Sequence, residues 1–302
     1  MALLIGSIQL GLVFALLAMG IFISFRILNI PDLTADGSFT LGLATSAALT
    51  FIGHPILGII AGLLAGCIAG SITGLLQTKI RIHPILSGII TMSALYTVNL
   101  YVLGARSNLT LIGNDTIFSL AIDNIGLDRE IIRVLLPLII CIALGLILFR
   151  FFKTHVGLCI RATGSNEDMV RSSSIHVDKT KILALAISNG CVALSGAVLA
   201  QYQSFADIGS GVGMMVVGLA SVIIGEAFFG KRSVGIGLIS ATVGSLIYRF
   251  VIALALSAAI FPAFALRLVS ALIVVLALSI PEIRKYIAKM KKRREARANV
   301  DA

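Results

Sequence analysis

The chain has 302 residues, of which 58% are hydrophobic and 13% are charged. Soluble domains carry about 25% charged and about 45–50% apolar residues, so the composition excludes a soluble fold. Continuous apolar runs of roughly 20 residues predict membrane-spanning helices rather than a barrel. The net charge of +10 does not indicate a nucleic-acid partner, because the basic residues gather in loops and in the C-terminal tail. The expected fold class is an all-α integral membrane protein.

Nine apolar runs predict about nine transmembrane helices, within a range of about 8–10. They cover residues 3–25, 38–52, 55–77, 84–103, 131–152, 182–202, 214–229, 233–256 and 262–280. The runs at 38–52 and 214–229 are short for a full crossing of about 20 residues. The first run is expected to be a retained helix, since no basic region precedes it. The predicted membrane domain is 1–281, followed by a basic tail at 282–302.

The loops, placed alternately on two sides, separate the basic residues unevenly. One side receives most of the 24 Lys and Arg residues, and the other receives Arg106, Arg129 and Arg133. The positive-inside rule therefore predicts that the basic side, with loop 153–181 and the C-terminus, lies in the cytoplasm. An odd number of crossings then places the N-terminus outside. Anionic membrane lipid is the expected partner of the tail.

Residues 29–42 are polar and irregular where an apolar run should begin. Asp36 or Ser38 is expected to cap the helix that follows, by accepting its free N–H groups. A helix start at a break in the membrane also attracts anionic groups. These properties make Asp36, Ser38, Phe39 and Thr40 candidates for a transport pathway. A simple capped loop is the alternative.

A faint internal repeat relates two glycine-rich segments. One begins at Gly42 and the other at Gly218, and each starts in a short apolar run, breaks, and continues into a long helix. The predicted topology points the two copies in opposite directions. Inverted repeats with paired broken helices are typical of transport pathways near the bilayer midplane.

Five glycines recur every four residues in the run at 55–77, namely Gly58, Gly62, Gly66, Gly70 and Gly74. Small residues at this spacing allow a neighbouring membrane helix to approach closely. We therefore predict a helix-packing role for the ladder, either inside the chain or at a subunit boundary.

Three ionisable residues lie inside apolar runs. Arg249 and Arg267 fall toward the predicted outer half of the bilayer, and Glu226 falls near its cytoplasmic end. Charged groups in a membrane usually face a cavity or a partner, so all three are pathway candidates. The arginines could steer a substrate carboxylate, or they could extend to the interface. Glu226 could instead pair with Lys231 or Arg232.

The charged loop 153–181 contains a short amphipathic segment with its own start signal. Ser165 and Asp168 have a spacing close to that of a capping box, which predicts a helix from about Asn166 to Ser174. Its small, mixed face favours docking to a partner over lying on the membrane surface. The docking candidates are Ser165, Asn166, Glu167, Asp168, Met169, Val170 and Arg171, with Met169 and Val170 as the apolar face.

No enzyme signature, Walker A motif or HExxH motif occurs in the sequence. The four cysteines have neither metal nor redox spacing, so no metal site is expected. We therefore predict no catalytic residue and no bound cofactor for this chain; any ATP and Mg²⁺ would belong to a partner ATPase.

Three segments carry a family resemblance: Asp32–Gly42, Arg161–Arg171 with the following Ile175, and Val217–Glu226. Together they resemble permeases of the branched-chain amino acid, ribose and simple-sugar ABC importers. Within that family the chain is most similar to tryptophan or tyrosine import permeases.

The resemblance implies a bacterial plasma (inner) membrane protein that works as one of two permeases, with a second copy of this chain, as a homodimer, or with a relative. Two ATPases would dock at the loop helix, and an extracytoplasmic binding lipoprotein would deliver the solute, most simply an aromatic amino acid. A secondary transporter or channel without an ATPase is the alternative. It would need ion-coupling carboxylates inside the membrane, and Glu226 is its candidate.

Overall fold

The computed structural model describes residues 2–126, 128–173, 175–230 and 233–257, together with Val275 and Ser279. Most of the expected run at 262–280, Arg267 and the tail 282–302 lie outside the described residues, as do Ser174, Lys231 and Arg232. The elements are, in order, α1 (Ala2–Ile21), the π-helix η1 (Phe22–Ile27), α2 (Thr34–Phe51), α3 (Pro55–Thr78), α4 (Pro84–Val102), β1 (Asn108–Thr110), α5 (Ile117–Ile125), α6 (Arg129–Phe151), α7 (His155–Ser165), α8 (Glu167–Ser172), α9 (Val177–Gln203), β2 (Phe205–Asp207), the 3-10 helix η2 (Ile208–Gly211), α10 (Met214–Phe229) and α11 (Val234–Ser257).

Seven segments of the described part are helical, long and apolar enough to cross a membrane. They include α1 with η1, and η2 with α10, as continuous spans, whereas α2 is not among them. The class of all-α membrane protein is thus confirmed. The count of about nine helices stays a prediction, since part of the chain beyond 257 is not described.

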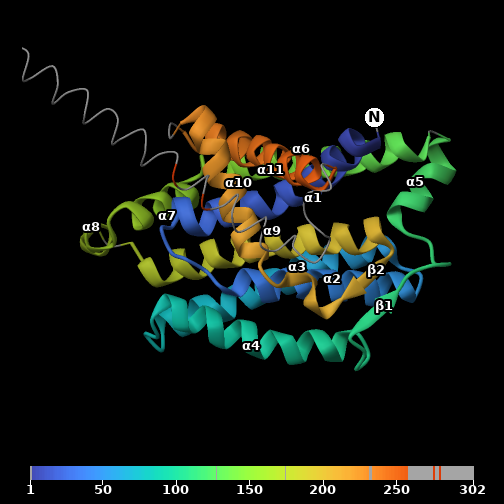
Figure 1. Cartoon of the computed structure of the whole chain (residues 1–302). Coiled ribbons are helices and arrows are strands. Elements are labelled where there is room, and N and C mark those ends of the chain that lie inside the picture. Colours follow the sequence, from blue (N-terminus) through green and yellow to red (C-terminus); the bar gives the residue numbers. More distant parts are fainter. Residues whose placement is uncertain are drawn as a thin grey trace, which may run out of the picture.

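The bundle has two distinct ends (Figure 1). Helices α7 and α8 lie at one end, called here the α8 end, and α5 with the β1–β2 pair lies at the other, called the α5 end. β1 pairs with β2 in antiparallel register, with Leu109 opposite Ala206. The short strands tie the loop after α4 to the chain that leaves α9.

Helices α1 and α9 form the buried centre, and the other crossing helices surround them. Glycines bring α3 against this centre. A Cβ atom at Gly70 would lie 2.2 Å from the backbone oxygen of Leu185, and one at Gly66 would lie 2.5 Å from that of Asn189, both on α9. Gly58 faces Ser46 on α2, Gly62 faces both helices, and Gly74 faces Ile182 on α9. The five-glycine ladder therefore lies along the side of α3 that contacts its neighbours within the chain.

Two helices begin inside the bundle and run in opposite directions. α2 follows the irregular segment 28–33 and ends toward the α5 end, where Gln201 donates hydrogen bonds to Ser46 Oγ and to the backbone oxygen of Pro55. α10 follows η2 and ends toward the α8 end, where Glu226 meets Arg26. The two starts lie side by side in the interior.

Asp32, rather than Asp36 or Ser38, supports the start of α2. Asp32 Oδ1 accepts a hydrogen bond of 2.9 Å from the Thr34 amide, and its other oxygen accepts one of 2.6 Å from Asn189 Nδ2. The expectation that Asp36 or Ser38 caps this helix is therefore wrong. Both residues lie within α2 rather than before it, and the Asp36 carboxylate accepts hydrogen bonds from the amides of Gly213 and Met215 instead.

Candidate functional site

Asp36 joins the two helices that begin inside the bundle. Its carboxylate accepts hydrogen bonds from the backbone amides of Gly213, at 2.9 Å, and Met215, at 2.7 Å. These amides belong to the first turn of α10, where N–H groups have no partner within the helix. A negative charge there also interacts favourably with the helix dipole. Asp36 thus caps a helix that lies far along the chain.

A close approach of backbones completes this junction. A Cβ atom at Gly211 would lie 2.1 Å from Thr40 Oγ1 and 2.2 Å from the backbone oxygen of Asp36. Only glycine allows η2 to lie this near to α2. The Thr40 hydroxyl is held by its own hydrogen bond to the Asp36 oxygen, at 3.1 Å.

A cavity of about 430 Å³ lies beside the junction, between α2, α4 and η2. It is large enough to hold a small solute. Its lining residues are Asp36, Gly37, Thr40, Met92, Ser93, Tyr96, Asn99, Ile208, Gly211 and Val212. Two of the four pathway candidates from 36–40 thus line a cavity together.

The cavity wall is mainly apolar and carries one carboxyl group. Asp36 is the only carboxyl group among its described lining residues, and none of them is lysine, arginine or histidine. Asn99 donates a bond of 3.2 Å to the Gly37 oxygen, whereas its own Oδ1 is buried and makes no hydrogen bond in the described part. Such a lining suits a group that donates hydrogen bonds and carries positive charge.

The remaining candidates face a different part of the core. Ser38 and Phe39 are fully buried, and the Phe39 ring stacks on Phe14 of α1 with centroids 6.1 Å apart. The Arg249 guanidinium lies over the Phe14 ring, 3.8 Å from its centroid. Phe14 therefore connects Arg249 to Phe39, but neither Arg249 nor Phe39 lines the cavity of Asp36. A pathway role for Arg249 stays a prediction.

Glu226 has a partner that sequence reasoning missed. Its carboxylate accepts two hydrogen bonds from Arg26, one from Nε at 2.5 Å and one from Nη2 at 2.7 Å. The pair joins η1 to the last turns of α10. Because the five guanidinium N–H groups form a rigid fork, this two-point geometry fixes the relative orientation of the two helices.

The loop helix α8 begins one residue later than the capping pattern predicted. Asn166 is its cap, and Oδ1 of that residue accepts a bond of 3.0 Å from the Met169 amide. Ser165 instead ends α7, where its hydroxyl donates to the Arg161 oxygen. The predicted Ser165 cap is wrong because α7 continues through that residue, which leaves its backbone helical rather than extended.

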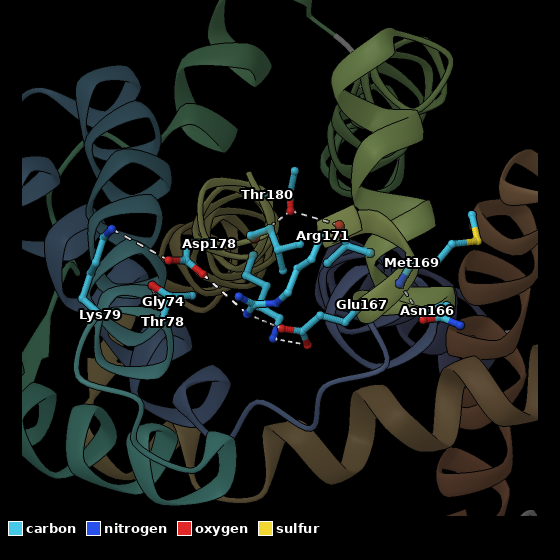
Figure 2. Close-up of polar contacts among 12 residues, drawn as sticks. Gly74, Thr78, Lys79, Asn166, Glu167, Met169, Arg171, Asp178 and Thr180 are labelled. Carbon is cyan, nitrogen blue, oxygen red and sulfur yellow. Dashed lines mark hydrogen bonds and ion pairs between the residues drawn. The ribbon is translucent and has the colours of Figure 1, made fainter. Parts of the chain in front are cut away.

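Glu167 anchors α8 to the neighbouring helix (Figure 2). It accepts 2.8 Å and 2.6 Å hydrogen bonds from Arg171 and Lys181, respectively. Partial burial raises the pKa of Glu167, but the bonds and charges of Lys181 and Arg171 outweigh it and hold that pKa below its ordinary value. Asp178 adds weaker ion pairs to Arg171, at 3.9 Å, and to Lys79, at 3.8 Å.

The two apolar residues of α8 point in different directions. Val170 is buried, whereas Met169 is 62% exposed and points away from the charged group in Figure 2. The prediction that both form one apolar face is wrong, because consecutive helical residues are separated by about 100°. Asn166, Asp168 and Arg171 are exposed around Met169. The outward surface of α8 is therefore a single apolar side chain within a polar rim.

Helix α7 connects this surface to η1. A Cβ atom at Gly164 would lie 1.9 Å from the backbone oxygen of Ile27 and 2.9 Å from Leu28 Cα. The Thr163 hydroxyl lies 3.0 Å from that of Thr180, which holds the same turn against α9. A shift of α7 would therefore press directly on η1, next to Arg26.

Asn99 and Tyr96 are cavity residues that the sequence pattern did not single out. Both lie in α4, and no charge, glycine pattern or break marks this helix as different from an ordinary membrane span. A polar amide within an apolar run was the available signal.

The comparisons with known proteins agree with this architecture. The family described as the permease component of branched-chain amino acid transport systems matches residues 3–278. A tyrosine transport system permease protein of Clostridioides difficile is 33% identical over 266 residues, covering 88% of this chain and 86% of the relative. An uncharacterized protein of Rickettsia prowazekii is 34% identical over 232 residues, covering 76% and 79% of the two chains.

A fructose import permease protein of Bifidobacterium longum is 28% identical over 153 residues, covering 50% of this chain and 42% of the relative. No solved structure matches the chain significantly. The seven apolar helical segments define a multi-pass membrane protein. The chain belongs to the family of branched-chain amino acid and simple-sugar permeases of ABC transporters.

Proposed function

We propose that this chain forms the translocation pathway of an ABC importer for an amino acid, with the α8 end in the cytoplasm. The observation that supports the solute class most strongly is the Asp36 carboxylate in the cavity where α2 and α10 begin. An amino acid carries an ammonium group, which matches the Asp36 carboxylate. A sugar has no such charge and would leave Asp36 unneutralised.

The family includes both amino-acid and sugar permeases, so the solute class is inferred from the residues that line the cavity. Met92 and Tyr96 add apolar and aromatic surface to the wall on α4. Aromatic rings are favourable neighbours for one another and for ammonium groups. The tyrosine permease relative favours the same solute class. An aromatic amino acid is the substrate that agrees with both the cavity wall and the relative.

The surface of α8 is the proposed contact for the ATPase, which would bind ATP and Mg²⁺. Met169 supplies the apolar centre and the polar residues around it supply the rim, as in protein interfaces generally. A second permease copy and an extracytoplasmic binding protein complete the proposed importer. The opposed starts of α2 and α10 support the proposed inverted repeat, whose halves move against each other.

The described contacts suggest how motion at α8 reaches the cavity. α7 touches η1 at Gly164, Arg26 of η1 holds Glu226 of α10, and the start of α10 is held by Asp36. Each step is a close packing contact or a two-point hydrogen bond. In this scheme Glu226 transmits movement, and its pairing with Arg26 disfavours an ion-coupling role in a secondary transporter.

Competition for uptake tests the solute class. In cells that lack their own aromatic amino-acid uptake, expression of the complete transporter should permit accumulation of radiolabelled tyrosine. Excess unlabelled tryptophan or phenylalanine should reduce that uptake, and fructose should leave it unchanged. Inhibition by fructose together with no effect of amino acids would contradict the proposal.

A further inference from the structure

A second cavity, of about 550 Å³, lies at the α5 end. It is enclosed by α5 and the loop before it, the start of α6, and the last residues of α9. The side chains that matter for its chemistry are Phe118, Asp123, Arg133, Tyr202 and Gln203. It is separate from the cavity of Asp36, and the two share no lining residue.

Two cations, Arg129 and Arg133, are among the described lining residues of this cavity, and Arg133 is the one that lies over an aromatic ring. Its guanidinium lies 5.2 Å from the centroid of the Tyr202 ring. In the described part of the chain it takes part in no hydrogen bond or ion pair, so its N–H donors are available on the cavity side. A guanidinium held by a ring on one face presents a planar fork that suits a carboxylate.

Tyr202 is itself held in place. Its hydroxyl donates a 2.7 Å bond to Gln9 Oε1, and Gln9 Nε2 donates a 3.0 Å bond to Glu130 Oε2. Phe118 meets the Tyr202 ring edge to face, with centroids 5.8 Å apart. The ring under Arg133 is therefore fixed by α1 on one side and by α5 on the other, which lowers the entropic cost of binding a ligand there.

The three chemical features of an aromatic amino acid have counterparts in this cavity. Arg133 suits the carboxylate, Phe118 and Tyr202 suit the aromatic side chain, and Asp123 is a carboxylate available to the ammonium group. We propose that the α5-end cavity is a second amino-acid site, which receives the solute before it reaches the cavity of Asp36. This inference rests on the proposed function and adds a carboxylate-recognising residue, Arg133, to it.

One segment of chain connects the two sites. Ser204 lines the α5-end cavity, and Ile208, Gly211 and Val212, a few residues later, line the cavity of Asp36. Solute bound at Arg133 would thus contact the chain that leads to the junction of α2 and α10. The arrangement suits transfer from the outer site to the inner one.

Photolabelling of the complete transporter in proteoliposomes tests the second site. The probe is 4-azidophenylalanine, and labelled peptides are identified by mass spectrometry after irradiation. We expect label on residues of α5 and the end of α9. Labelling there should fall about tenfold or more with Arg133→Gln, because a charge-assisted hydrogen bond to the carboxylate is lost. Arg133→Lys should retain part of it.

Two controls show whether the label depends on the cavity and on the carboxylate of the probe. Arg106→Gln, an exposed arginine at the same end that does not line the cavity, should leave labelling unchanged. The methyl ester of the probe, used on the unmodified protein, should label α5 and α9 about tenfold less, since it lacks the carboxylate. Equal labelling by acid and ester, or no label at α5 and α9 while tyrosine uptake persists, would overturn the second site. If the unmodified protein neither takes up tyrosine nor is labelled, the proposed function is overturned instead.

Discussion

Replacing Asp36 with alanine is expected to lower amino-acid uptake by about 100-fold or more, because two contributions are lost together. The cavity loses the negative charge of its carboxylate. The amides of Gly213 and Met215 lose their acceptor, and each buried unsatisfied group costs about 1–3 kcal/mol. Initial rates of tyrosine uptake, normalised to the amount of protein in the membrane, measure the effect.

The variant Asp36→Asn separates the two contributions. Its amide oxygen can still accept one of the two backbone bonds, but it carries no charge. We expect its thermal stability to lie between those of the alanine variant and the unmodified protein. Its uptake should be as low as that of the alanine variant. Asp115→Ala, an exposed acid outside the cavity, should transport normally. Unimpaired uptake by Asp36→Asn would show that the charge does not contact the solute.

Breaking the Arg26–Glu226 pair is expected to uncouple η1 from α10. Glu226→Gln removes the charge from an ion pair whose side chains are only 28% and 13% exposed. We expect a loss of about 2 kcal/mol in stability, below the roughly 3–5 kcal/mol of a fully buried pair because Arg26 keeps some exposure. A lower Tm in detergent, together with ATP hydrolysis that no longer drives uptake, is the expected result.

The charge-swapped double variant, Arg26→Glu with Glu226→Arg, should recover part of both properties, since opposite charges face each other again. Asp178→Asn is a matched control. Asp178 forms longer pairs with more exposed partners, so its loss should change stability by less than about 1 kcal/mol. If the swap recovers nothing while the protein remains folded, the pair is not the link between η1 and α10.

The fold class follows from the sequence because it depends on composition and on run length, which are local properties. The glycine ladder of α3 was equally readable, since small residues at spacing four indicate a close helix contact wherever the partner lies. The pattern could not name that partner, and the structure shows α9 and α2.

Contacts between residues far apart in the chain could not be predicted from the sequence in the same way. Asp36 was selected as a polar residue in an irregular segment, but its hydrogen-bond partners lie 177 and 179 positions away. For Glu226 the sequence offered Lys231 or Arg232 as alternative nearby partners, whereas the partner in the described part, Arg26, is 200 positions distant. In both cases a nearby partner was chemically acceptable, and only the packing of the bundle decides between near and distant ones.

A small shift in a helix end accounts for the wrong cap in the charged loop. Ser165 and Asn166 are both good capping residues, and the sequence does not say how far α7 continues. The apolar face was wrong for a separate reason: Met169 and Val170 are consecutive helical residues, about 100° apart, so Met169 lies on the outward surface and Val170 is directed inward.

The most direct test of an ATP-driven importer with α8 as its docking site is co-purification of the tagged chain from its native membrane in a mild detergent. We expect an ATP-binding-cassette subunit to accompany the unmodified chain and the control Ile112→Asp, which changes an exposed apolar residue at the α5 end. Met169→Asp should lose that subunit while retaining its own fold. A chain that purifies alone, or an ATPase that stays bound to Met169→Asp, would contradict the proposed docking of an ATPase at α8.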